Sequence, residues 1–137
     1  MKRFVSTGII MIVTIINLYG QIPDSLKYKS LKPHDFLLLY LKSDSSMLID
    51  VRESFEFTGK RLKGAVNIPS SGKLESATDT INRNRSLFLY CTSGVRSKRI
   101  AVRLYDLGFR KLYSLEGGIT AWKKERLPVI RGKKAKK

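Results

Sequence analysis

The stretch SLFLYCTSGVRS, residues 86–97, decides the fold of this 137-residue chain. Residues 86–90 are a nearly unbroken apolar run, which predicts a buried strand that ends directly before Cys91. From Ser97 to Leu107, apolar residues recur three and four positions apart and Gly108 follows, which predicts an amphipathic helix with a glycine stop. A buried strand, a short polar loop and a helix in this order favour an α/β fold.

The segments on either side continue this alternation of strands and helices. Strands are expected around Tyr28 and over residues 47–51, 65–68 and 111–115, and helices over residues 33–41, 53–57, 74–84 and after Gly118 through Trp122. Alternating elements of this kind build a sheet of parallel strands, and the chain length provides room for one domain. We therefore predict a single small α/β domain with a central parallel sheet flanked by helices on both faces.

Cys91 lies at the carboxyl end of the predicted strand, where α/β folds bind ligands. The free N–H groups and the positive dipole end of the next helix point toward this loop, so the pKa of the thiol should be lowered. Gly94 allows backbone angles that direct consecutive N–H groups inward, and Arg96 offers a guanidinium suited to an oxyanion. We expect Cys91 to be the nucleophile, with an anion pocket formed by Thr92, Ser93, Gly94, Val95 and Arg96 and supported by Ser97.

The cysteine and histidine counts argue against several other kinds of site. A single cysteine excludes an internal disulfide and a multi-cysteine metal site, and a single histidine, His34, makes a zinc or Ser-His-Asp site a poor interpretation. We therefore expect no metal and no cofactor. A lone cysteine is more often buried and inert than reactive, so it is the loop around Cys91 that favours chemistry.

Such a pocket suits the transfer of sulfur from a small anion. A thiolate attacks the outer sulfur of a donor such as thiosulfate, sulfite leaves, and the resulting Cys91 persulfide is an anion that needs the same hydrogen-bond donors. A thiol or a cyanide-like molecule would then accept the sulfur. A polysulfide or a protein persulfide would fit the same pocket, so the physiological donor and any protein acceptor are left open.

Motifs spread over most of the chain resemble those of the rhodanese-like domain family. They are CTSGVRS at residues 91–97, DVRE at 50–53, KGAVNIP at 63–69, LGF at 107–109 and LEGGITAW at 115–122. Their order and spacing agree from Leu31 to Pro128. The resemblance implies a small rhodanese-like fold over residues 31–128, sulfurtransferase activity of the thiosulfate type, Cys91 as the sulfur carrier and residues 92–96 as the anion pocket.

The segment before the KGAVNIP motif departs from the family, which often has Gly-His there. Here Arg61 and Leu62 occupy that neighbourhood, so no histidine contributes, although Arg61 near the pocket would suit an anionic substrate. Asp50 and Arg52 are candidates for supporting the site. A charged pair at the end of a strand is, however, more often a brace between neighbouring loops.

Residues 1–20 have the layout of a secretory signal peptide. Lys2 and Arg3 precede an apolar run from Phe4 to Tyr19, and Gly20 is the expected last residue before cleavage. We expect export to the periplasm, with an uncleaved membrane anchor as the alternative. Residues 21–30 would form a lead-in segment and residues 129–137 a basic tail.

The formal charge of +16 favours contact with anions and anionic surfaces. The sequence RGKKAKK at residues 131–137 is expected to be unstructured, and it suggests a weak contact with an anionic membrane surface. Nucleic acid is disfavoured as a partner, because no groove-reading motif is present and export would separate the protein from it.

Two other functions remain open at the level of sequence. The same residues would serve a persulfide carrier or an anion-binding module that acts for a partner protein without turnover. A phosphatase is the remoter alternative, because related folds hold phosphate esters in a loop between a cysteine and an arginine. Those loops have five intervening residues, whereas Thr92 to Val95 supply four, which makes a smaller cradle.

Overall fold

The computed structural model describes residues 20–132. The predicted signal peptide or membrane anchor, residues 1–20, lies outside the described part of the chain except for Gly20, and residues 133–137 of the predicted basic tail also lie outside it. Between residues 20 and 132, no helix combines the length and the apolar character needed to cross a membrane.

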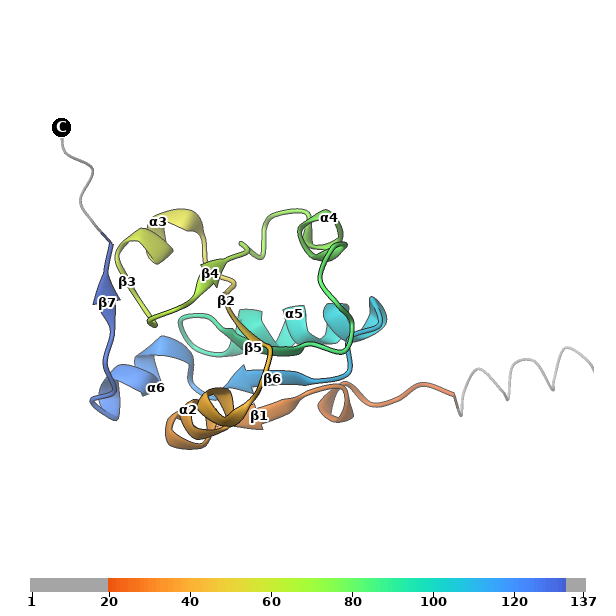
Figure 1. Ribbon diagram of the computed structural model, residues 1–137, viewed down its shortest axis with the longest axis horizontal. Helices are drawn as coiled ribbons and strands as arrows, with labels where there is room; N and C mark the ends of the chain where they lie inside the picture. The colour runs from red at the N-terminus through yellow and green to blue at the C-terminus, as the bar shows by residue number, and fades with distance from the viewer. Residues whose placement is uncertain (1–19, 133–137) are drawn as a thin grey trace, which may run out of the picture.

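Five strands form one parallel sheet in the spatial order β1-β6-β5-β2-β4 (Figure 1). The strands are β1 (Lys29–Leu31), β2 (Ser46–Asp50), β4 (Val66–Asn67), β5 (Ser86–Tyr90) and β6 (Leu112–Leu115). β5 lies at the centre, and its residues 87–90 are fully buried because helices cover both faces. This explains the continuous apolar sequence of β5 and confirms the predicted central parallel sheet.

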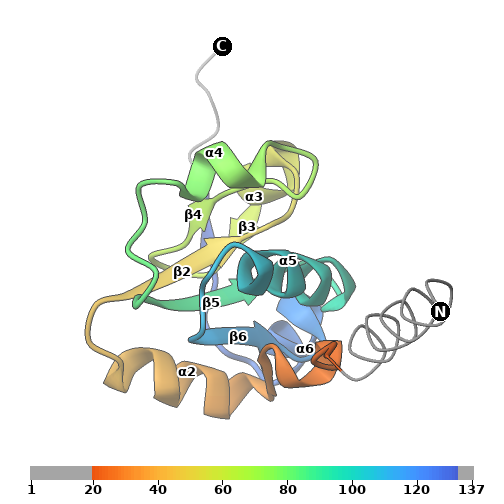
Figure 2. The same cartoon turned by 90° about the vertical axis from the view of Figure 1, so that its right-hand side faces the viewer.

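The helices that cover the sheet are divided between its two faces. They are α2 (Pro33–Lys42), α4 (Leu74–Thr78), α5 (Val95–Asp106) and α6 (Gly118–Lys124), and a 3-10 turn η1 (Asp24–Leu26) precedes β1. Leu87 and Leu89 of β5 point into an apolar layer shared with α4 and α5, and Figure 2 shows α5 next to β5 and β6. Phe88 and Tyr90 point into the opposite layer, shared with α2 and α6, because side chains alternate along a strand.

A second, two-stranded sheet lies beside the five-residue helix α3 (Ser54–Thr58). Its strand β3 (Lys60–Arg61) pairs antiparallel with β7 (Ile130–Arg131), and the amide of Gly132 donates to the carbonyl oxygen of Gly59 at 2.9 Å. The prediction of an unstructured tail from Arg131 onward is therefore wrong for Arg131, because pairing with a distant segment orders it.

The boundaries of α4 and α5 also differ from the predictions. The helix expected over residues 74–84 ends at Thr78, where Nη1 of Arg83 donates to the carbonyl oxygens of Thr78 and Ile81, each at 2.8 Å. An arginine that satisfies these carbonyl groups allows the chain to leave the helix early. α5 begins at Val95 rather than at Ser97, so its first turn lies closer to Cys91 than predicted.

Candidate functional site at the Cys91 loop

The loop that carries Cys91 joins the end of β5 at Tyr90 to the start of α5 at Val95. Gly94 makes the turn between them with a φ of +95°, a backbone conformation that other residues rarely adopt. A Cβ atom at Gly94 would also lie 3.2 Å from the amide nitrogen of Gly117. Glycine at this position thus keeps the loop tight enough to return its own amides toward the sulfur.

The sulfur of Cys91 is buried, yet it faces polar groups. The backbone N–H of Gly94 donates to Sγ at 3.1 Å, and the hydroxyl oxygen of Ser97 lies 3.7 Å from it. Burial alone would raise the pKa of the thiol, but its hydrogen bonds with the backbone and hydroxyl of Ser97 and with the amides of Gly94 and Ser93 outweigh burial. The pKa of Cys91 therefore lies below its ordinary value, and the thiolate is favoured.

A second serine holds the Ser97 hydroxyl in place. Ser97 Oγ donates to the carbonyl oxygen of Gly94 at 3.1 Å and lies 2.9 Å from Ser114 Oγ, and both serines are fully buried. Ser114 belongs to β6, opposite Leu89 in the β5–β6 register. The sequence analysis did not identify Ser114, because a single serine in an apolar strand has no local pattern that reveals its partner.

The first turn of α6 binds the backbone of the Cys91 loop. The amides of Ile119 and Thr120 donate to the carbonyl oxygens of Cys91 and Thr92 at 2.9 and 3.2 Å. Gly118 has a φ of +61°, and a Cβ atom there would collide with both carbonyl oxygens. The glycine pair of the LEGGITAW motif thus allows α6 to approach the backbone of the cysteine loop closely.

Arg96 and Thr92 are engaged by an acidic residue that the sequence analysis missed. Arg96 donates from Nη1 to Glu56 Oε2 at 2.8 Å and from Nη2 to Glu56 Oε1 at 3.0 Å. The hydroxyl of Thr92 also donates to Glu56 Oε1 at 3.1 Å and accepts a hydrogen bond from Arg96 Nη2 at 3.0 Å. The guanidinium of Arg96 is therefore directed at a carboxylate of α3 and not at the Cys91 sulfur.

The Glu56 carboxylate is itself well stabilised. Arg96 is the main reason that its pKa is lowered from 4.5 to about 2, and a hydrogen bond from the backbone N–H of Glu53 contributes. This bond is part of a capping box that closes the start of α3. Glu56 stands forty positions before Arg96, so only the fold brings the two together.

The remaining predicted pocket residues occupy different positions around the loop. Ser93 is exposed and contributes its backbone amide near the sulfur, whereas the side chain of Val95 is 59% exposed at the start of α5. The structure thus assembles the cradle around Sγ from backbone amides and Ser97 rather than from the side chains of residues 92–96.

Asp50 and Arg52 form a buried ion pair with each other. Arg52 Nη2 donates to Asp50 Oδ2 at 2.7 Å and to the carbonyl oxygen of Lys60 at 2.8 Å. The side chains of Arg52 and Asp50 are 8% and 0% exposed, so each buried charge needs the other as its partner. The pair connects the end of β2 to β3, which matches the structural interpretation of the DVRE motif.

Arg61 lies beside α3 and not at the cysteine loop. Its Nη1 donates to the carbonyl oxygen of Phe57 at 3.3 Å, and its guanidinium lies 4.7 Å from the centre of the Phe57 ring. The expectation that Arg61 would supply charge to the pocket has no support from these contacts.

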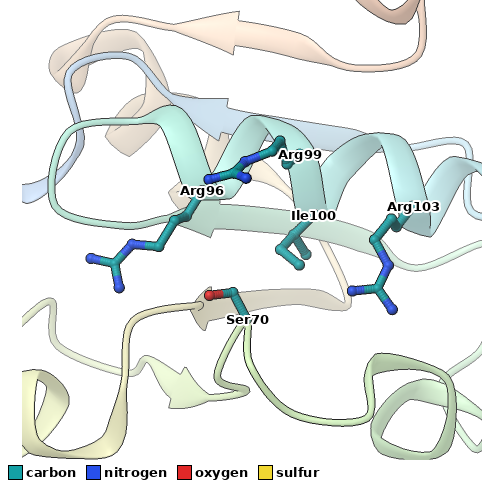
Figure 3. A pocket seen from close by; sticks show the side chains of 5 residues that line it. All are labelled: Ser70, Arg96, Arg99, Ile100 and Arg103. Carbon is teal, nitrogen blue, oxygen red and sulfur yellow. The ribbon is translucent and has the colours of Figure 1, made fainter.

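A pocket of about 240 Å³ lies next to the loop, along the outer side of α5. It is lined by Ser70, Arg96, Arg99, Ile100 and Arg103 (Figure 3). Across residues 20–132, no group of three or more histidine, cysteine, aspartate or glutamate residues is placed to hold a metal ion. The site offers a cysteine thiol with a lowered pKa beside a pocket lined by three arginines.

Comparison with known proteins matches residues 33–125 to the family model described as the rhodanese-like domain. The uncharacterized protein YqhL of Bacillus subtilis (strain 168) is 39% identical over 94 residues, which cover 69% of this chain and 71% of that protein. Thiosulfate sulfurtransferase GlpE of Coxiella burnetii is 28% identical over 83 residues, covering 61% of this chain and 77% of that protein.

Other similar proteins are longer, or are known as solved structures. The tRNA uridine(34) hydroxylase of Staphylococcus carnosus is 32% identical over 103 residues, and the match spans only 32% of that protein. A crystal structure of a rhodanese-related protein from Thermoplasma volcanium is 30% identical, with a TM-score of 0.63 and coverage of 75% of this chain and 98% of that one. The rhodanese-like domain protein from Staphylococcus aureus is 26% identical, with a TM-score of 0.61 and coverage of 69% and 90%.

Proposed function

Because the chain belongs to the rhodanese-like domain family, we propose that it is a sulfurtransferase of the thiosulfate type, in which Cys91 carries the transferred sulfur as a persulfide. The observation that carries the proposal is the position of the Cys91 sulfur, which accepts the Gly94 N–H at 3.1 Å where β5 meets α5. The similarity to thiosulfate sulfurtransferase GlpE supports the same chemistry.

In the first half of the reaction, the Cys91 thiolate attacks the outer sulfur of thiosulfate. The S–S bond of the donor breaks, its electron pair leaves with sulfite, and a new S–S bond joins Cys91 to the transferred sulfur. No general base is needed when the thiolate already exists, and the hydrogen bonds from Gly94 and Ser97 favour that state.

In the second half, an acceptor such as cyanide or a thiolate attacks the terminal sulfur of the persulfide. The S–S bond to Cys91 breaks, and its electron pair returns to Sγ, which leaves as a thiolate. A sulfur with a lowered pKa is a better leaving group, so the same hydrogen bonds assist both halves.

Cyanide-dependent formation of thiocyanate from thiosulfate tests the proposal. We expect many turnovers per molecule of wild-type protein and none for Cys91→Ser, whose folding is checked by circular dichroism. A wild-type protein that folds but makes no thiocyanate would contradict the thiosulfate assignment.

The burial of Cys91, which is only 1% exposed, favours a second candidate function. A covered persulfide is protected from solvent, as suits a carrier that delivers sulfur inside a complex with a partner protein. Transfer of one sulfur per Cys91, without further turnover, would favour the carrier over the enzyme.

We also propose that the protein acts after export, most simply in the periplasm. This part rests on the charged and apolar pattern of residues 2–19. Mass spectrometry of the protein isolated from its native membrane and periplasmic fractions provides the test. A soluble form that begins at Gln21 supports export with cleavage, whereas a membrane-bound form that retains residues 1–20 supports the anchor.

A further inference from the structure

The pocket beside the cysteine loop contains positive charge to which the transfer steps above assign no role. We propose that the pocket lined by Ser70, Arg96, Arg99, Ile100 and Arg103, here called the arginine pocket, binds the carboxylate of an organic persulfide that donates its sulfur to Cys91. This inference rests on the proposed sulfurtransferase function and names a donor class for the same site.

The three arginines lie on one face of α5. Arg96, Arg99 and Arg103 are separated by three and four positions, which places them side by side on a helix. Figure 3 shows them around the pocket, with Ile100 between Arg96 and Arg103 and Ser70 facing the helix. The backbone N–H of Ser70 donates to the carbonyl oxygen of Val51 at 2.9 Å, which holds this wall to the end of β2.

The charges of the arginine pocket are only partly compensated. Arg96 is paired with Glu56, and Arg103 is paired with Glu75 at 2.9 Å. Arg99 makes no ion pair with any residue of the described segment 20–132. One guanidinium is therefore available without displacement of a protein carboxylate.

The Arg103–Glu75 pair, at the opposite end of the pocket from Arg96, is easily broken in favour of a ligand carboxylate. The side chains of Arg103 and Glu75 are 45% and 59% exposed, and exposed pairs of this kind are weak. The Arg96–Glu56 pair is less exposed, at 29% and 20%, and is bidentate. A ligand carboxylate is thus expected to bind Arg99 first and to recruit Arg103, while Arg96 stays with Glu56.

The arginine pocket adjoins the loop that carries the reactive sulfur. Arg96 belongs to the first turn of α5, directly after the Cys91 loop, and hydrogen bonds to Thr92 of that loop. The side chain of Ile100 packs in the same apolar layer as Cys91. A molecule that fills the pocket along α5 therefore has one end next to the loop that holds Sγ.

The size and lining of the pocket suit an organic anion better than an inorganic one. A volume of about 240 Å³ corresponds to roughly eight waters at ~30 Å³ each, so a small inorganic dianion would leave most of it unfilled. Ile100 offers an apolar surface for an aliphatic segment, Ser70 a hydroxyl, and Arg99 a fork for a carboxylate.

The transfer balances without an added oxidant or reductant. The Cys91 thiolate attacks the outer sulfur of the donor persulfide R–S–SH, and the donor S–S bond breaks. Its electron pair leaves on the inner sulfur, which takes the proton to become the thiol R–SH. Cys91 retains the outer sulfur as its persulfide.

Glutathione persulfide and the persulfide of 2-mercaptoethanol are the two probes, because only the first carries carboxylates. Single-turnover loading of Cys91 is followed by mass spectrometry as the gain of one sulfur atom. We expect wild-type protein to load faster from glutathione persulfide, and Arg99→Gln to reduce that rate about tenfold, the scale of one charge-assisted hydrogen bond. In Arg99→Gln, the ratio of the loading rate from glutathione persulfide to that from 2-mercaptoethanol persulfide should fall by about the same factor.

Lys98→Gln is the matched control, because it removes one positive charge from the same helix outside the pocket. If Arg99→Gln and Lys98→Gln change both donors equally, the effect is general electrostatic attraction and the subsite is overturned. Failure of the proposed function would look different, since wild-type Cys91 would then gain sulfur from neither persulfide nor thiosulfate.

A binding measurement tests the subsite without any chemistry. S-methylglutathione, which cannot transfer sulfur, is titrated calorimetrically into the Cys91→Ser protein and into its Arg99→Gln and Lys98→Gln derivatives. We expect binding that is weakened about tenfold by Arg99→Gln and much less by Lys98→Gln. Equal binding by all three proteins would overturn the assignment of the arginine pocket.

Discussion

At Cys91, two opposing effects act on the same sulfur atom. The apolar layer around it disfavours a negative charge, whereas the amides of the loop and the hydroxyl of Ser97 favour one. The hydrogen bonds prevail, so a residue that looks like a core cysteine by exposure alone is a thiolate candidate by geometry. Local contacts, not burial, decide its character.

We predict that Ser97→Ala raises the pKa of Cys91, because both the hydroxyl near Sγ and its link to Ser114 are lost. Thiolate absorbance in the ultraviolet, recorded against pH, measures the shift. The kcat/KM for thiosulfate should fall about tenfold, the scale of one hydrogen bond to a charged group. Ser76→Ala, at an exposed serine of α4, is the control. An unchanged titration in Ser97→Ala would remove Ser97 from the cradle.

Glycine at position 118 is predicted to be essential for stability. Gly118→Ala introduces both an unfavourable φ and a collision with the carbonyl oxygens of Cys91 and Thr92, so the free energy of unfolding should fall by about 3 kcal/mol. Gly108→Ala separates the two causes, because Gly108 has a φ of +100° but a Cβ atom there would meet only the Arg83 side chain, at an ordinary contact distance of 3.7 Å. We expect a loss of about 1 kcal/mol there in urea unfolding. Equal losses of unfolding free energy in the two variants would show that the collision of a Cβ atom at position 118 with the cysteine loop costs no stability.

The predictions from sequence succeeded for single residues where a motif had a local physical reason. The position of Cys91 between a strand and a helix, the turn at Gly94 and the nearness of Ser97 all follow from neighbours within six positions. Glu56 and Ser114 were missed because their partners stand forty and seventeen positions away, and no periodicity reports such contacts.

At the scale of elements, α3 depends on its contacts for its existence. Five residues are too few for a helix that is stable by itself. The capping box closes its start, Arg61 donates to the carbonyl oxygen of Phe57 near its end, and Glu56 connects it to α5. A short helix thus becomes one side of the site through three separate anchors.

The Glu56–Arg96 pair gives the fold an acid-sensitive contact. The folded-state pKa of Glu56 is about 2, below the ordinary 4.5, so the stabilisation is present above pH 4.5 and is lost as the pH falls toward 2. We expect Glu56→Gln to lower the free energy of unfolding by about 1–2 kcal/mol at neutral pH, since the pair is partly exposed. Urea unfolding at several pH values should show this difference shrink in acid. A difference that is constant with pH would contradict the assignment.

Freeing Arg96 is also expected to change substrate use. Glu56→Gln removes the negative charge that occupies the guanidinium, so thiosulfate should bind more readily and its KM should fall several-fold. Steady-state thiocyanate formation measures the change. Glu75→Gln, which removes the α4 carboxylate that pairs with Arg103 of α5, is the matched control. A KM that rises in Glu56→Gln would indicate that Glu56 positions Arg96 for the substrate.

Predictions of elements were accurate where a continuous pattern existed. β5 was predicted with its observed bounds, because a buried central strand is apolar throughout. β3 and β7 were not predicted, since each has two residues and forms only by pairing with the other across most of the chain. The early end of α4 depends on the Arg83 side chain, which helix propensity does not describe.

At the scale of the whole molecule, charge and topology differ in how far the sequence reveals them. The α/β class followed from alternation, but the strand order β1-β6-β5-β2-β4 depends on pairings that no local segment encodes. The net charge of +16 was visible from composition alone. The gathering of Arg96, Arg99 and Arg103 around one pocket with Ser70 became apparent only with the fold.

This charge makes a prediction about ionic strength. Attraction of a dianionic donor over distances near the Debye length, about 10 Å at 0.1 M salt, is screened as salt increases. The kcat/KM for thiosulfate should therefore fall several-fold between roughly 0.01 and 0.15 M sodium chloride. Loading from 2-mercaptoethanol persulfide, which carries at most one negative charge, should respond less. Equal salt dependence for both donors would argue against electrostatic steering by the arginines of α5.

The contacts of α6 with the cysteine loop have a consequence for biosynthesis. Ile119 and Thr120 bind the carbonyl groups of Cys91 and Thr92, yet they leave the ribosome well after Cys91 does. A nascent polypeptide that has emerged only as far as Glu116 lacks these two supports of the loop backbone. The cysteine loop can thus acquire its full set of hydrogen bonds only late in synthesis.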